Sequence, residues 1–589
     1  MSAWASATAL VGKFRFLLTP AERKSALALL GLMALGMGFE TLCTGLVVPV
    51  VALITQPDLL AAHPRLLELA ARFGVAGHAS LVVAAMLSLV AIYAVKNLYL
   101  AFLAWRQARF TYGVQASLAQ RLFATYLRQP YAFHLRRNSA ELISNATREI
   151  AVFTDALFSA LIIATELLVL AGISTLLIAI EPLGALVAVL ILAGAAWSFH
   201  HATRRRAVRW GERRQVHEGL RLQHLQQGLG GAKDVKLLGR EEEFLAQFAI
   251  HNAQGAHVAH LQGTLLQLPR LWLELLAVLG LAALVVTMLL QGKSAASVAP
   301  TLGLFAVAAF RLMPSVNRLL AGVQSLRYAR SAIDMLEREL ALAVPPAPAR
   351  RVAAVRPGLQ SEIALVNLGY TYAEAPTPAL SAVNVRIGKG EAVGFIGTSG
   401  AGKSTLVDVL LGLLPPGVGQ VRVDGADVQE NLRAWQDQIG YVPQSVYLTD
   451  DSLRRNVAFG VADADIDDAA VTRAIRAAQL DEFVAALPQG LDSVIGKRGV
   501  RLSGGQRQRI GIARALYHDP AVLVLDEATS ALDTATERGV MQAVAALHGR
   551  KTIVIIAHRL STVAGCDRLY RLETGRVVAE GTHAEVLPT

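Results

Sequence analysis

Long apolar runs, separated by polar and often positively charged segments, fill the first 320 residues of the chain. Most of them reach the roughly 20 residues that an α-helix needs to cross a bilayer. They lack the continuous polar face that a helix of a soluble protein turns to water. The pattern predicts six membrane-spanning helices, near 25–53, 79–105, 156–180, 183–199, 271–291 and 299–320.

The segments between these runs differ in charge. Residues 106–150 carry seven arginines against two glutamates, and residues 200–240 carry ten lysines and arginines against three acids. The other connections carry few cations. Because positive loops stay on the cytoplasmic side, both long loops and the N-terminus are expected in the cytoplasm, in a multi-pass protein of the cytoplasmic (inner) membrane. The N-terminus shows no signal-peptide pattern.

The pattern changes after a proline-rich stretch at 344–358, which cannot continue a helix. Beyond it, short β-rich runs alternate with helical stretches, which is typical of an α/β domain with a largely parallel sheet. We therefore predict a multidomain membrane protein: an all-α transmembrane domain at 1–343, a linker at 344–358 and an α/β P-loop domain at 359–589.

The composition and the distribution of charge argue against some classes of function. Hydrophobic residues make up 53% of the chain, and its net charge is +11. Residues 1–350 hold 32 Lys and Arg against 19 Asp and Glu, whereas residues 351–589 hold 24 against 26. The basic excess belongs to the apolar half, which excludes nucleic-acid binding as its explanation. Two cysteines cannot build a disulfide framework.

The strongest motif is GTSGAGKS at 397–404, which follows a predicted strand and opens a predicted helix. This is the context of a P-loop, whose backbone N–H groups surround phosphate oxygens. Lys403 should reach the β- and γ-phosphates, and the Ser404 hydroxyl should bind Mg²⁺. The residues expected to hold ATP are Gly397, Ser399, Gly400, Gly402, Lys403, Ser404 and Thr405.

Two carboxylates follow the apolar run VLVL at 522–525. Ligand sites of α/β sheets lie at the carboxyl ends of the strands, so both should face the phosphates. We expect Asp526 to bind Mg²⁺ and Glu527 to polarise the attacking water as the catalytic base.

The segment RLSGGQ at 501–506 resembles the signature of ABC ATPases, and the resemblance extends in order over residues 362–585. It implies that Tyr372 stacks on adenine, Gln444 contacts Mg²⁺ and His558 contacts the γ-phosphate. Lys497 departs from the family, where a glutamate is usual, so the role of that residue is not carried over.

Six spans before one nucleotide domain resemble a half-exporter of this family, which implies two subunits. Ser503, Gly505 and Gln506 of one subunit would then complete the ATP site of the other, and Asp533 would join the two sites. A homodimer is expected because all motif residues are present. The resemblance also implies coupling helices near Asn138–Leu142 and Gly231–Glu243.

Further segments resemble the lipid-linked oligosaccharide flippases of bacterial protein N-glycosylation: GFET at 38–41, PRLWLE at 269–274, RLMPSVNR at 311–318 and GCDR at 565–568. This resemblance implies that the cargo is an anionic lipid-linked glycan, a polyprenyl-pyrophosphate glycan. It also implies that the protein contacts membrane lipids. The resemblance further implies a transport cavity lined by three cations, Lys96, Arg270 and Arg311, which would bind the pyrophosphate of the cargo. Cations within a membrane usually face protein or water, which fits this placement.

Two alternatives remain open from sequence alone. One is a multidrug or lipid exporter, including one for lipid A-type molecules. The other is an ATP-gated channel, which the intact Glu527 argues against. Membrane spans exclude a soluble ABC ATPase of repair or translation.

Overall fold

The computed structural model describes residues 3–55, 78–180, 182–290, 295–343, 359–373, 375–496, 502–528, 534–557 and 559–586. The chain divides into two compact units. The helical unit comprises Met1–Gln129 and Arg136–Pro345, and the α/β unit comprises Pro130–Leu135 and Pro346–Thr589. The predicted linker at 344–358 lies outside the described residues.

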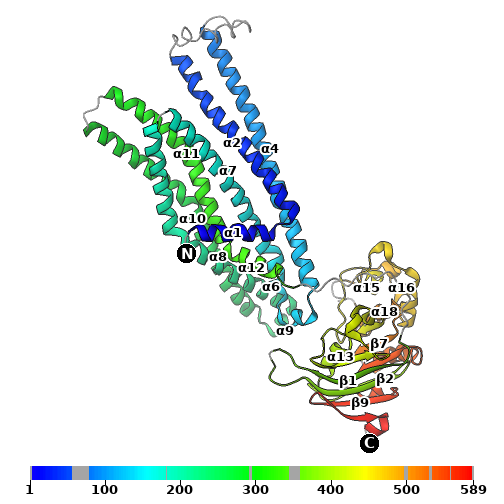
Figure 1. The fold of residues 1–589 in the computed structure, drawn as a ribbon. Coiled ribbons are helices and arrows are strands. Elements are labelled where there is room, and N and C mark those ends of the chain that lie inside the picture. Colours follow the sequence, from blue (N-terminus) through cyan, green and yellow to red (C-terminus); the bar gives the residue numbers. More distant parts are fainter. Residues whose placement is uncertain are drawn as a thin grey trace. The chain divides into compact units, whose positions relative to one another are not determined.

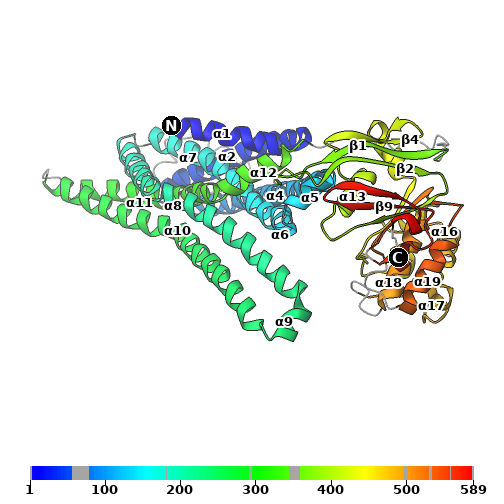
Figure 2. The ribbon, with the colours of Figure 1, turned by 90° about the horizontal axis from the view of Figure 1, so that it is seen from below.

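Six long helices dominate the described part of the helical unit and run side by side in bundles (Figure 1). They are α2 (Pro20–Thr55), α4 (His78–Leu127), α7 (Ile150–Ile180), α8 (Pro182–Gly230), α10 (Glu241–Leu290) and α11 (Ala295–Tyr328). The shorter elements are α1 (Ala3–Leu17), α6 (Ser139–Ser144), the π-helix η2 (Asn145–Glu149), α9 (Ala232–Leu238) and α12 (Arg330–Leu340). Helices α8 and α10 form a long hairpin closed at α9 (Figure 2).

Three helical stretches in the described residues are long and apolar enough to cross a membrane: Pro20–Leu46, His78–Leu127 and Ser139–Leu176. The other three predicted spans fall on helices that include side chains outside the description. Within α4, large apolar side chains such as Leu98 (76% exposed) and Leu87 (66%) point away from the protein. Such exposure suits a helix whose neighbour is lipid, because a large apolar surface in water marks an interface.

Glycines let helices of this unit approach closely, as in other membrane bundles. A Cβ on Gly211 of α8 would lie 2.0 Å from the carbonyl oxygen of Tyr328, at the end of α11. A Cβ on Gly172 of α7 would lie 2.3 Å from the Thr41 hydroxyl of α2. Any side chain at either position would push its helix away from the neighbour.

The α/β unit contains two sheets. In the six-stranded sheet the order is β10-β9-β3-β8-β7-β6, and all neighbours are parallel except β10 and β9. The second sheet, β2-β1-β4-β5, is antiparallel. The predicted α/β domain is confirmed, and the antiparallel sheet adds to it. The strands are β1 (Glu362–Tyr370), β2 (Leu380–Gly388), β3 (Ala392–Ile396), β4 (Val418–Val423), β5 (Ala426–Asp427), β6 (Ile439–Val442), β7 (Val522–Asp526), β8 (Thr552–Ile556), β9 (Arg568–Glu573) and β10 (Arg576–Gly581).

Helices cover the parallel sheet and complete two hydrophobic cores. Those with a direct role below are α13 (Lys403–Leu410) and α18 (Gly504–Leu516). The remaining helical elements are α14 (Leu432–Gln436), α15 (Leu453–Val457), α16 (Asp468–Ala477), α17 (Asp481–Ala485), α19 (Thr534–Ala545), α20 (Leu560–Val563), α21 (His583–Val586) and short 3₁₀ turns at Val428–Asn431, Asp463–Asp465 and Gly490–Asp492.

One segment of the connection between α4 and α7 groups with the α/β unit. Pro130–Leu135, most of α5 (Tyr131–Arg136), belongs to that unit, and Ala132 packs against its second core. The expected coupling helix near Asn138–Leu142 instead overlaps α6, in the helical unit. The segment that groups with the α/β unit therefore comes earlier in the chain than the resemblance implied.

Candidate nucleotide site

The glycine-rich loop joins a fully buried strand to a helix. All five residues of β3 are buried, so the loop starts from a fixed point. Gly397 and Gly402 have φ values of 153° and 97°, in a region that favours glycine. A Cβ on either would lie within 2.7 Å of a backbone carbonyl oxygen, that of Leu572 or Ala379. Neighbouring backbone therefore packs against the loop at both glycines, where a side chain would clash.

Lys403 lies inside this loop. Its ammonium donates hydrogen bonds to the carbonyl oxygens of Gly397 (2.9 Å) and Thr398 (3.0 Å), and the residue is only 5% exposed. Burial lowers the pKa of Lys403, although the charges of Glu527 and Asp526 act in the opposite direction. The neighbouring Ser404 is exposed at the first turn of α13. This geometry offers a cation, a hydroxyl and a helix N-terminus to one anionic group.

The predicted carboxylates stand at the carboxyl end of β7. Burial and the charge of Glu527 raise the pKa of Asp526, while a hydrogen bond from Tyr441 (3.3 Å between oxygens) and the charge of Lys403 oppose the shift. Two adjacent carboxylates repel each other, so this setting favours a bound cation that lies between the carboxylates on one side and an anionic ligand on the other.

Glu527 has a backbone conformation that is unusual for a residue with a side chain. Its φ is 46°, and its N–H donates to the carbonyl oxygen of Ile556 on β8 at 3.0 Å. Such strain persists only where the surrounding structure fixes it, and it often occurs at functional sites. The Gln444 amide donates to the Glu527 carboxylate at 2.8 Å. The structure thus brings Gln444, predicted from a separate motif, to the catalytic candidate.

Sequence reasoning missed Asp408, which lies on α13 one turn beyond Ser404. Burial and the charge of Asp526 raise the pKa of Asp408 to about 6. The i, i+4 spacing from Ser404 was the available signal, since both residues lie on one helix face. Asp408 therefore adds a third carboxyl group to the acidic side of the site.

The signature segment forms a helix start rather than an open loop. Ser503 caps α18 by accepting from the Gln506 N–H at 3.2 Å, and the Gln506 side chain accepts from the Ser503 N–H at 2.9 Å. Ser503 and Gly504 are exposed at this reciprocal capping box, whereas Gly505 is buried. The side-chain oxygen of Gln506, expected to contact nucleotide, is occupied within its own helix start.

Helix α18 is also tied to the Gln444 segment. Gln508 donates to the backbone carbonyl oxygen of Gln444 at 2.8 Å. Sequence motifs gave no sign of this link. A displacement of the signature helix would therefore move the residue that contacts Glu527.

Tyr372 lies beside the P-loop helix, where its hydroxyl is 3.1 Å from the Thr405 hydroxyl. Its ring meets that of Tyr370 edge-on. His558 and Asp533, expected at the γ-phosphate and between the two sites, lie outside the described residues, as does Lys497.

Two of the three cations assigned to the cargo, Lys96 and Arg270, have described side chains. Lys96 is 6% exposed, and its ammonium lies 3.0 Å from the Glu40 carboxylate of α2 and over the Tyr93 ring. Its charge is therefore neutralised between two helices. Arg270 is exposed on α10, and the Arg311 side chain lies outside the description.

Comparisons with known proteins give the family. Residues 380–530 match the model of the ABC transporter family, and residues 65–293 match that of the ABC transporter transmembrane region. An ATP-dependent lipid A-core flippase from Cupriavidus metallidurans is 33% identical over 486 residues, which cover 81% of this chain and 80% of that protein. The chain belongs to the ABC transporter family.

Other relatives agree with this assignment. A lipid A-core flippase from Alkalilimnicola ehrlichii is 32% identical over 80% of each chain. One from Cupriavidus pinatubonensis is 44% identical over 230 residues, and this alignment spans only 39% of each chain. The solved structure of a bacterial Atm1-family ABC exporter with ATP bound superposes with a TM-score of 0.77, at 25% identity and over 96% of both chains.

The chain is thus an ATP-hydrolysing half-transporter of the ABC exporter type, a multi-pass membrane protein whose architecture implies a dimer. The predictions of exporter fold, ATP binding and ATPase activity are confirmed. These relatives carry the name lipid A-core flippase, so they favour the lipid-exporter alternative over the lipid-linked oligosaccharide reading.

Proposed function

We propose that this half-transporter is an ATP-driven flippase for a phosphorylated glycolipid of the lipid A-core type. The observation that carries the proposal is the similarity to lipid A-core flippases through both units, over about four fifths of each chain. The lipid-facing apolar side chains of α4 are compatible with an amphiphilic cargo that never leaves the membrane.

The polyprenyl-pyrophosphate glycan is the second candidate, and it shares the phosphate and the sugars of the first. Its support is the exposed Arg270 in the segment that resembles oligosaccharide flippases. The Lys96–Glu40 pair weakens it, because a neutralised ammonium offers little to a pyrophosphate. Lipid A-core is therefore the preferred cargo.

We further propose roles in ATP hydrolysis for the residues of the nucleotide site. Lys403 would bind the phosphates from within the loop, and Ser404, Gln444 and Asp526 are the oxygen donors that fit Mg²⁺. Bound Mg²⁺ would neutralise the phosphate charge. Glu527, held by Gln444 and by the strained backbone, would orient the attacking water.

The cargo is tested with purified protein in proteoliposomes. ATP-dependent flipping and ATPase stimulation are measured with lipid A-core glycolipid, a polyprenyl-pyrophosphate glycan, phosphatidylcholine and an apolar drug. We expect lipid A-core to be flipped, and to stimulate ATP hydrolysis more than the other three. Preferential flipping of the polyprenyl glycan would overturn the preferred cargo, and drug stimulation alone would overturn both glycolipid readings.

A further inference from the structure

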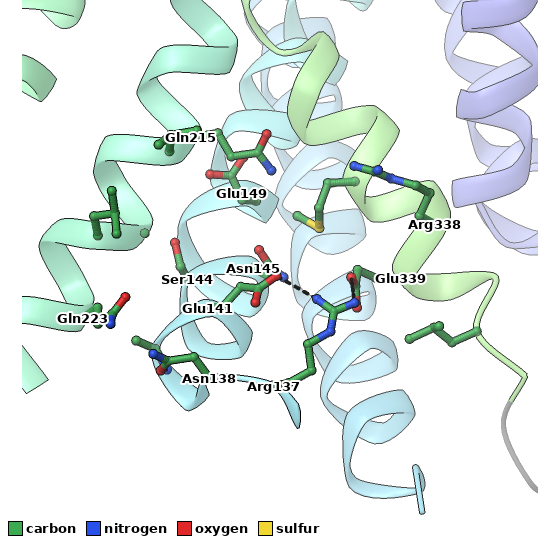
Figure 3. A pocket seen from close by; sticks show the side chains of 16 residues that line it. Arg137, Asn138, Glu141, Ser144, Asn145, Glu149, Gln215, Gln223, Arg338 and Glu339 are labelled. Atoms are coloured by element: carbon green, nitrogen blue, oxygen red, sulfur yellow. Dashed lines mark hydrogen bonds and ion pairs between the residues drawn. The ribbon is translucent and has the colours of Figure 1, made fainter. Parts of the chain in front are cut away.

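The described part of the helical unit contains a polar cavity of about 460 Å³ between α6, η2, α8 and α12 (Figure 3). It lies outside the nucleotide site and uses none of the proposed cargo residues. Charged and amide side chains line much of it, including Arg137, Asn145, Glu149 and Glu339. A cluster of this kind inside a helical bundle needs internal pairing to be stable.

Arg137 connects two parts of this cavity. It donates to Glu339 of α12 at 3.2 Å and to Glu141 of α6 at 2.7 Å. Figure 3 shows its guanidinium between these two carboxylates. Glu141 is half exposed, whereas Glu339 is 6% exposed and one of its carboxylate oxygens has no hydrogen-bond partner among the described residues. Because a buried carboxylate requires a counter-charge, Glu339 depends on Arg137 far more than Glu141 does.

Other polar side chains near this pair are themselves paired. The π-helix η2 turns Asn145 and Glu149 inward, and such turns often occur at functional positions. Asn145 donates to the Tyr126 hydroxyl at 3.2 Å, and Glu149 accepts two hydrogen bonds from the buried Arg214 of α8. These contacts tie η2 to α4 and to α8 beside the cavity.

The pair lies close to points where the chain passes from one unit to the other. Arg137 follows directly after α5, most of which belongs to the α/β unit. Glu339 lies at the end of α12, after which the chain leaves the helical unit for the α/β unit. The ion pair thus joins segments next to two of the three points at which the chain passes between the units, 135/136 and 345/346.

We propose that Arg137 and Glu339 form a latch that makes α12 and the segment after α5 move as one body when ATP is hydrolysed. In this role they are positioning residues: they touch neither ATP nor cargo, and they transmit motion from one unit to the other. Breaking the latch should uncouple ATP hydrolysis from transport rather than stop hydrolysis. The proposal rests on ATP-driven export, whichever lipid is the cargo.

The test is a double-mutant cycle of Arg137→Gln, Glu339→Gln and the double variant in the full-length protein. Transport per ATP hydrolysed is measured in proteoliposomes with the lipid that the wild type flips. We expect each single variant to lose roughly tenfold in this ratio, the scale of coupling between distant sites. The double variant should be no worse than either single one, because both remove the same interaction.

Glu141→Gln is the matched control, since it removes the other carboxylate bound by Arg137 and spares the latch. A transport-independent measurement uses spin labels at Leu135 and Ala341, with and without added ATP and vanadate, which trap the protein with ADP and vanadate after hydrolysis. We expect a narrow distance distribution in the wild type and a broadened one in Arg137→Gln. If Arg137→Gln and Glu141→Gln behave alike, or if the two effects of the cycle add, the latch is refuted. Failure of the wild type to flip lipid A-core would count against the proposed cargo and leave the spin-label result valid.

Discussion

The α/β unit and the helical unit position their charged side chains in different ways. In the α/β unit the backbone positions the charged side chains. Lys403 and Glu527 each come after a buried parallel strand, and glycine or strained backbone conformations fix the directions of their side chains. In the helical unit side chains fix one another across helices, as in Lys96–Glu40 and Arg214–Glu149.

This difference decides how a substitution acts. A side chain aimed by a strand end can be replaced by an isostere without disturbing the fold, so the loss falls on chemistry. A buried charge held by another charge cannot be removed alone, because its partner is left uncompensated. Substitutions of side chains at the strand ends of the α/β unit should therefore affect rates, and those of buried, paired charges in the helical unit should affect stability or coupling.

The largest expected effect is on the rate of ATP hydrolysis, from a substitution at a strand end of the α/β unit. Glu527→Gln should slow ATP hydrolysis by about 10² or more, the scale for loss of a catalytic base, while ATP binding and the unfolding midpoint stay near wild type. Steady-state phosphate release and nucleotide binding measure the two properties. Glu430→Gln, in a surface turn, is the control. ATPase activity close to wild type in Glu527→Gln would remove this residue from the mechanism.

The second prediction asks whether the signature helix acts on the partner subunit. Lys403→Ala and Ser503→Arg homodimers should each lose most ATPase activity, because every site lacks one half. Mixed dimers retain one intact pairing, so co-purified heterodimers with two affinity tags should recover activity of about half the wild-type value, if the sites act independently. Activity of mixed dimers no higher than that of either homodimer would mean that the sites are not shared.

The same contrast explains what the sequence could predict. The P-loop, Asp526 and Glu527 were predictable because local motifs determine strand, turn and helix together. Asp408 had only its spacing from Ser404 as a local signal and Gln508 had none, because their partners Asp526 and Gln444 come from distant segments. Lys96 was assigned to the cargo from its charge within a predicted span and from the resemblance to oligosaccharide flippases. Its partner Glu40 lies 56 positions earlier on another helix, and only the packing of α2 against α4 joins them.

The third prediction turns on this pair. Lys96→Gln alone should destabilise the helical unit by roughly 3 kcal/mol, the cost of leaving a buried charge unpaired, whereas Lys96→Gln with Glu40→Gln should recover most of it. Thermal unfolding in detergent measures the effect. Arg270→Gln, on the surface of α10, is the control and should leave stability unchanged. Lost transport with unchanged stability in Lys96→Gln would instead return this lysine to the cargo site.

The smallest expected effect concerns the half-buried Asp408, whose pKa is raised to about 6 by burial and by the charge of Asp526. In the unfolded chain its pKa is near the ordinary 3.8. The folded state therefore binds this proton more tightly, and the residue costs stability progressively as pH rises from about 4 to about 6, with no further change above.

Asp408→Asn removes that cost. At pH 7.5 it should raise the unfolding temperature of the full-length protein by about 2–4 °C, the shift for roughly 1 kcal/mol in a domain of this size, after allowing for solvent screening. At pH 4 the variant and the wild type should unfold together. Asp465→Asn, on an exposed turn, should shift neither value. An Asp408→Asn variant with the same advantage at both pH values would mean that packing, and not the charge beside Asp526, sets the energy of this position.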